Sequence, residues 1–162
     1  IEDVGEAVGE AKNAEKLVRE MKAKHQWIAR KVKGARKVKA IMVYGHDPLI
    51  LAGRETFADD LIQIAGGINM ARDSKIKYPK FSLERIIYEK PEAILEASHS
   101  PDYDSIGVDE IYKFWARWEN IPAVRDKRII IIPADIITRP GPRIVDGLIA
   151  IAKALHPERF GE

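Results

Sequence analysis

The chain has 162 residues, 46% of them hydrophobic and 7% aromatic, so it is long enough to bury a substantial core. Its 27 basic and 25 acidic residues give a net charge of +2, which excludes the strongly basic surface of a typical nucleic-acid-binding domain. The sequence contains no cysteine, which excludes disulfides and thiol catalysis and agrees with an exported protein. Because the chain starts at Ile1 and not at methionine, we expect a processed product or a piece of a longer protein.

A long amphipathic helix is predicted for residues 11–33, and residues 1–8 are interpreted as the end of a preceding helix. Four glutamates lie in or just before the N-terminal half of the long helix, Glu6, Glu10, Glu15 and Glu20, unlike the basic helices that bind membrane surfaces. We therefore interpret it as a packing helix that ends at Gly34. Its apolar residues form one stripe: Ala14, Leu17, Val18, Met21, Trp27, Ile28 and Val32.

Short apolar runs then alternate with helical patterns. Thr56 and Ser82 are predicted helix N-caps, because each precedes an apolar pattern with helical spacing. This alternation predicts an α/β fold with a mostly parallel sheet flanked by helices. The predicted elements are a strand at 38–44, a glycine-bounded loop at 45–53, helices after Thr56 and Ser82, a strand at 93–97 and a helix at 108–119.

The last strand, loop and helix lie between Arg128 and Leu155. Four consecutive isoleucines that end at Pro133 predict a short strand buried on both faces. A helix is predicted to start at Pro142, with Gly141 as its N-cap. In open α/β sheets ligands lie outside the carboxyl ends of the strands, so the polar residues of the loop are functional candidates. These residues are Asp135, Thr138, Arg139 and Arg143.

Several motifs follow one another along the chain: Gly45 to Gly53 with Thr56-Phe57 and Asp60-Leu61, Ala65-Gly66-Gly67-Ile68-Asn69, Tyr78-Pro79, Ser82-Leu83-Glu84, Ile121-Pro122-Ala123-Val124 and Arg139-Pro140-Gly141-Pro142-Arg143. Their order resembles the substrate-binding proteins of ABC importers for cobalamin, iron-siderophore complexes and haem. The resemblance implies two α/β lobes joined by a rigid helix, with the ligand in the cleft between them. Residues 1–36 would be the end of a missing lobe and the interlobe connector helix, and residues 37–162 a single Rossmann-like C-terminal lobe that binds the ligand.

Five residues are predicted to contact the ligand: His46, Asp47, Tyr78, Asp135 and Arg139. His46 and Asp47 follow the first predicted strand, although His-Asp-Pro also makes turns. Tyr78 matches the cleft rim of the family, where a ring stacks on a flat ligand, but it could equally cover its own helix. Arg139 can grip a carboxylate with two parallel hydrogen bonds, whereas the alternative for an arginine here is an ion pair with Asp135.

The resemblance also implies a docking role for Glu84, because a glutamate in this Ser-x-Glu setting contacts arginines of the ABC permease transmembrane subunits. The alternative is a favourable interaction with the helix dipole. Trp115 and Trp118 lie three residues apart on one predicted helical face, which favours core packing over a stacking platform.

No common catalytic motif is present, so we expect a solute-binding protein and not an enzyme. The alternative is a chelatase-like enzyme that acts on a tetrapyrrole, with His46 or His99 as base or metal acceptor. No cofactor and no protein-built metal site are expected, and a metal would arrive only inside a bound chelate.

The expected partners are a metal chelate, the permease, the missing N-terminal lobe and, through Val18, Met21 and Trp27 of the long helix, a second copy of the chain. Nucleic acid is not expected. The expected location is periplasmic or extracytoplasmic, with or without a membrane anchor in the full-length protein.

Overall fold

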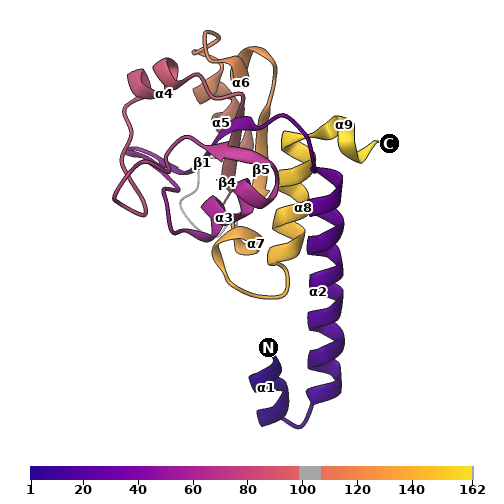
Figure 1. Ribbon diagram of the computed structural model, residues 1–162. Helices are drawn as coiled ribbons and strands as arrows, with labels where there is room; N and C mark the ends of the chain where they lie inside the picture. Colours follow the sequence, from indigo (N-terminus) through magenta and orange to yellow (C-terminus); the bar gives the residue numbers. More distant parts are fainter. Residues whose placement is uncertain (99–106, 162) are drawn as a thin grey trace.

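Apolar residues on both faces of the strands allow helices to cover the central sheet from both sides. The computed structural model describes residues 1–98 and 107–161 (Figure 1). In the sheet the strand order is β2-β1-β4-β5, and β3 also pairs with β1. The β1–β3, β1–β4 and β4–β5 pairs are parallel and only β1–β2, of the pairs described, is antiparallel. The strands are β1 (Val38–His46), β2 (Leu49–Leu51), β3 (Gly67–Asn69), β4 (Ala93–Ser98) and β5 (Ile129–Pro133).

Two apolar clusters, one on each face of the sheet, attach the helices. The first contains residues of α2 (Ala11–Lys31), α3 (Phe57–Ile64), α7 (Asp135–Thr138) and α8 (Ile144–Leu155). The second contains residues of α4 (Leu83–Glu89), α5 (Val108–Trp115) and α6 (Pro122–Arg125). The predicted α/β class with a mostly parallel, helix-flanked sheet is confirmed.

The predicted long helix is present as α2. It lies beside α8 and extends beyond the sheet, where α1 (Glu2–Ala7) folds back against it (Figure 1). Ile28 is fully buried, Lys24 Nζ lies 3.1 Å from Asp146 Oδ1 of α8, and the Trp27 ring packs edge-on against Phe160 of α9 (Pro157–Phe160). These contacts hold the C-terminal half of α2 on the lobe and leave its N-terminal half projecting.

Two predicted helix caps are confirmed. Thr56 Oγ1 accepts a hydrogen bond from the Asp59 N–H at 3.2 Å, and Ser82 Oγ accepts one from the Arg85 N–H at 3.3 Å. Each bond satisfies one of the backbone N–H groups that a helix leaves free in its first turn.

Several sequence predictions were wrong in detail. Strand β5 is not buried on both faces: it lies at the edge of the described sheet, and of its isoleucines only Ile132 is buried. Helix α8 begins at Ile144 with Arg143 as N-cap, two residues later than predicted, and the loop before it contains the short helix α7. The short helix α6 (Pro122–Arg125) is absent from the predicted elements; Ile121 is its N-cap and Pro122 lies in its first turn.

The junction between α2 and the sheet is held by an ion pair. The Arg36 guanidinium binds both carboxylate oxygens of Glu92, at 2.6 and 3.1 Å, and the Lys39 N–H donates to Glu92 at 3.0 Å. The hydrogen bond from Arg36 lowers the pKa of Glu92 below its ordinary value. The ion pair therefore stabilises the fold at pH values above the ordinary carboxyl pKa. This stabilisation is lost as the pH falls through the lowered pKa of Glu92.

Candidate functional site

The carboxyl ends of β1, β4 and β5 lie next to one another at one edge of the sheet, because these strands are parallel neighbours. Asp47 directly follows β1, and Asp135 and Arg139 follow β5. Asp47 and Arg139 are exposed and Asp135 is half-buried. Three of the predicted ligand-contact residues therefore share one edge, which we call the ligand edge. Residues 99–106, which follow β4 and include His99, lie outside the part of the chain that the structure describes.

Tyr78 reaches the same region by a different route. Residues 77–81 run beside β2, with hydrogen bonds from the Leu51 N–H to Pro79 O at 3.1 Å and from the Gly53 N–H to Lys77 O at 2.7 Å. The Tyr78 side chain is 54% exposed, and its ring packs edge-on against Tyr44 of β1 with 5.7 Å between the ring centroids. An exposed aromatic ring with a fixed neighbour is suited to contact a flat ligand surface.

Tyr44 was missed by the sequence analysis. Burial, and to a smaller extent the neighbouring Tyr78, raises the pKa of Tyr44 well above its usual range. The phenol is therefore neutral at physiological pH. The signal that could have found it is an aromatic residue at the end of a buried strand, directly before a glycine loop.

His46 points into the lobe. A β-bulge at Val43 and Gly45 interrupts the β1–β2 register, and His46 is the last residue of β1. Its side chain is 9% exposed, with Nε2 3.2 Å from Glu96 Oε1 and its ring 4.8 Å from the Phe114 ring. Ligand contact by His46 stays a prediction, and it would require this side chain to leave its buried partner.

Arg139 and Arg143 both follow β5, but only one of them makes an ion pair with Asp135. Arg143 Nη1 lies 2.7 Å from Asp135 Oδ2, so this arginine makes the ion pair that was the alternative to ligand contact. Arg139 takes part in none of the ion pairs found among residues 1–98 and 107–161. Its guanidinium is accordingly the better candidate for an anionic ligand group.

Glu84 lies in the first turn of α4 and is exposed. Hydrogen bonds from its own backbone N–H and from Ser82 lower the pKa of Glu84, so the side chain is charged at neutral pH. The neighbouring Arg85 packs its guanidinium over the Phe81 ring at 4.0 Å and lies near Glu89. No ion pair of Glu84 is found in the described parts of the chain, so its charge faces solvent.

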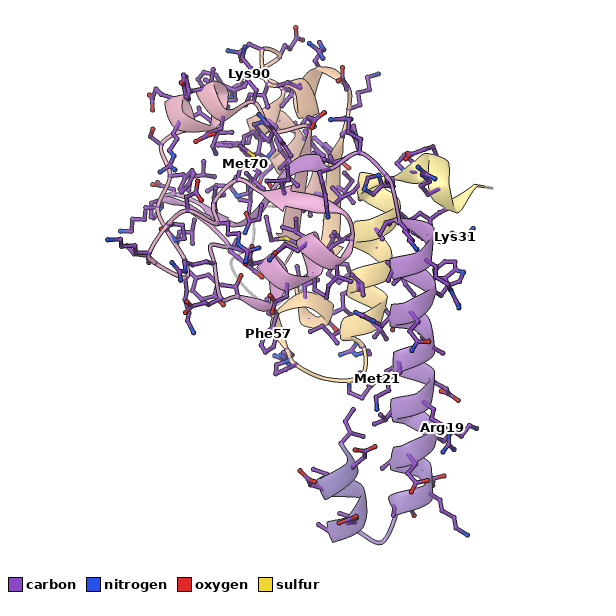
Figure 2. All side chains as sticks on the ribbon, in the orientation of Figure 1. Arg19, Met21, Lys31, Phe57, Met70 and Lys90 are labelled. Carbon is purple, nitrogen blue, oxygen red and sulfur yellow. The ribbon has the colours of Figure 1, made fainter. Side chains whose placement is uncertain are left out.

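An apolar groove of about 620 Å³ lies between the helical hairpin formed by α1 and α2 and the rest of the lobe. Met21 and Phe57, two of its lining residues, are labelled in Figure 2. Ile1 and Val4 of the hairpin are largely exposed on one side, and Pro140 and Pro142 line the other. The groove adjoins the ligand edge, because Pro140 directly follows Arg139.

Two features are absent from the described residues, 1–98 and 107–161. His, Asp and Glu side chains form no cluster of three or more that could hold a metal ion in these residues. None of the helices within them has the length and apolar character needed to cross a membrane.

Comparison with known proteins identifies the family. The model of a family described as periplasmic binding protein matches residues 1–136. An uncharacterized ABC transporter substrate-binding lipoprotein, YvrC, of Bacillus subtilis is 29% identical over 100% of this chain and 50% of its own length. The vitamin B12-binding protein of Vibrio parahaemolyticus is 23% identical over 94% of this chain and 53% of its own length.

A solved structure agrees with this assignment. The periplasmic heme-binding protein RhuT from Roseiflexus sp. RS-1 superposes with a TM-score of 0.79 at 27% identity, covering 98% of this chain and 61% of RhuT. The chain spans about half the length of the two sequence relatives. It belongs to the periplasmic binding protein family.

Proposed function

We propose that this chain is the C-terminal lobe, with the interlobe connector helix α2, of an extracytoplasmic substrate-binding protein that serves an ABC importer. The observation that carries the proposal is the ligand edge, where Asp47, Asp135 and Arg139 follow parallel strands and Tyr78 lies against the end of β1. Capture and delivery of a ligand is the mechanism, and no chemical step is required of the chain. The location is periplasmic or extracytoplasmic, with or without a membrane anchor in the full-length protein.

The proposed ligand is a metal chelate: an iron siderophore, haem or a cobalamin. Such ligands combine flat or apolar surface with carboxylate or amide groups. Arg139 can bind a carboxylate through two hydrogen bonds, and the Tyr78 ring can cover an apolar face. The metal belongs to the ligand, and no cofactor of the protein is invoked.

The chelatase-like alternative is less well supported by the described residues. A general base must lie within hydrogen-bond reach of its substrate, whereas His46 is buried and bonded to Glu96. Release of metal from a porphyrin, or its insertion, by the purified chain would favour the enzyme. Binding of an intact chelate without turnover favours transport.

Titration with coloured chelates tests the proposal. The 162-residue chain would be titrated with cyanocobalamin, haemin and a ferric hydroxamate, while absorbance and melting temperature are recorded. One of them should bind, weakly, because a single lobe encloses only part of a ligand. Arg139→Gln and Tyr78→Ala should each weaken that binding by about tenfold.

Arg117→Gln is the matched control, because it removes an exposed arginine that follows α5, an element that supplies none of the residues of the ligand edge. Its affinity should equal that of the unmodified chain. Equal affinities for Arg139→Gln and Arg117→Gln would mean that the ligand does not use the proposed edge.

The permease is the second proposed partner, with Glu84 as its contact. In the complete receptor, Glu84→Arg should reduce uptake by about tenfold while ligand affinity stays unchanged, since a reversed charge at a docking rim opposes association. Glu119→Arg makes the same charge change at an exposed site outside α4. Uptake at the unmodified rate by the Glu84→Arg receptor would leave Glu84 with only its helix-dipole role.

The other half of the receptor is the third proposed partner. The apolar groove between α2 and the lobe, lined by the exposed Val4 and by Met21, is surface that a neighbouring lobe can bury. In the isolated chain this groove is open to a second copy, and Met21 is the one residue of the proposed self-association set, Val18, Met21 and Trp27, that lines it. Of these three, Val18 and Met21 are half-buried and Trp27 is 37% exposed.

A further inference from the structure

A carboxylate is buried beneath the ligand edge without a role in the function proposed above. Glu96 is 1% exposed and lies in β4, a strand whose other residues are mostly apolar. Two donors converge on its Oε1: His46 Nε2 at 3.2 Å and the indole Nε1–H of Trp115. An ionisable group this deeply buried is expected only where it is paired.

The three side chains connect two strands that end at the ligand edge, β1 and β4, to helix α5. His46 ends β1 and precedes the loop that contains Asp47, Glu96 lies two residues before the end of β4, and Trp115 ends α5. The β-bulge in β1 brings the imidazole to the face of the sheet that carries α5, which is the face of Glu96 and Trp115. Through its contacts with His46 and Trp115, Glu96 therefore links the C-terminal end of β1 to α5.

The chemistry of the three groups limits how the cluster can be charged. An indole only donates, so it cannot neutralise a carboxylate. Phe114 and Trp115 pack against the imidazole, and the described hydrogen bonds and ion pairs bring no further charged side chain to His46 or Glu96 from β1, β4, α5 or β5. A net charge in this position is strongly disfavoured, so the pair is most stable with one neutralising proton.

We propose that Glu96 and His46 are a charge-neutral positioning pair that sets the conformation of the hairpin loop between β1 and β2 with its flanking residues (45–53), with Trp115 as the fixed donor that orients the carboxylate. The proposal rests on the proposed function only in so far as this loop belongs to the ligand edge. It assigns His46 a role in holding the edge in place.

Three glutamine variants distinguish the loss of the neutralising charge from the loss of a hydrogen bond, through their melting temperatures. In His46→Gln a buried carboxylate keeps an amide donor but loses its neutralising partner, and the melting temperature should fall by about 10 °C. In Glu96→Gln the amide oxygen still accepts from both donors, and the shift should stay within about 3 °C. The double variant His46→Gln/Glu96→Gln contains no ionisable group in the cluster and should recover to within about 3 °C of the unmodified chain.

The positioning role is measured by NMR on the unliganded chain. Backbone amide resonances of residues 45–53 and the Trp115 indole N–H should shift in His46→Gln and return in the double variant, whereas those of α8 should stay in place. If His46→Gln does not fold, folding of the double variant is itself the rescue.

Three outcomes would overturn the proposal: no destabilisation in His46→Gln, no rescue in the double variant, or rescue of stability without any response of residues 45–53. The chelate titration is independent of this test, because no ligand is present. A failed titration combined with a successful rescue would reject the ligand and keep the positioning pair.

Discussion

Replacing Trp115 with alanine is expected to lower the free energy of unfolding by about 3 to 5 kcal/mol. Trp115 is fully buried in the cluster that joins α4, α5 and α6 to the sheet, and its ring packs edge-on against Phe114 with 5.0 Å between centroids. The substitution leaves a large cavity, and it also removes one of the two donors of Glu96. Urea denaturation followed by circular dichroism would measure the loss as a lower midpoint at constant slope.

Phenylalanine at the same position separates the cavity from the hydrogen bond. Trp115→Phe keeps most of the ring volume but leaves the buried carboxylate with one donor fewer, at a cost of about 1.5 to 3 kcal/mol. Trp118→Phe is the matched control, because the indole N–H of Trp118 is buried without a hydrogen-bond partner among the described residues. Losing that N–H should change stability by less than about 1 kcal/mol. Equal losses in the two phenylalanine variants would show that the bond to Glu96 contributes nothing.

Much of the fold could be predicted from the sequence because its signals are local. The stripe in α2, the Thr56 and Ser82 caps and the alternation of strands with helices depend on neighbouring residues, and all are present. The burial of β5 depends instead on which strands flank it. A run of isoleucines does not reveal that the strand lies at the sheet edge, so its exposure was wrongly predicted.

The candidate site was predicted where it follows from topology and missed where it depends on side-chain direction. Asp47, Asp135 and Arg139 come together because parallel strands end at one edge. Glu96 and His46 are separated by 50 positions, and only the bulge in β1 places them on one face. A lone glutamate in an apolar strand was the visible sign that a buried partner existed.

Gly53→Ala is expected to destabilise the chain and to displace Tyr78, because the backbone of residues 76–79 passes directly over this glycine. A Cβ at Gly53 would lie 2.5 Å from Ile76 O and 3.1 Å from Lys77 O. These are backbone atoms that cannot rotate away, so the whole segment must shift. The shift strains the Gly53 N–H bond to Lys77 O and moves Tyr78 away from Tyr44. We expect a loss of about 1 to 3 kcal/mol in the free energy of unfolding, as for other overpacked sites.

Gly45→Ala is the control, since the same added methyl group at the other end of the loop meets Pro48 O at 3.6 Å, an ordinary contact distance. Its free energy of unfolding should stay within about 0.5 kcal/mol of that of the unmodified chain. Denaturation measures both variants, and NMR contacts between the Tyr44 and Tyr78 rings report the position of the aromatic pair. Because the ligand edge uses Tyr78, Gly53→Ala should also weaken chelate binding, and Gly45→Ala should not. Retention of the ring contacts in a destabilised Gly53→Ala chain would show that residues 76–79 yield without moving Tyr78, and the binding loss would then not be expected.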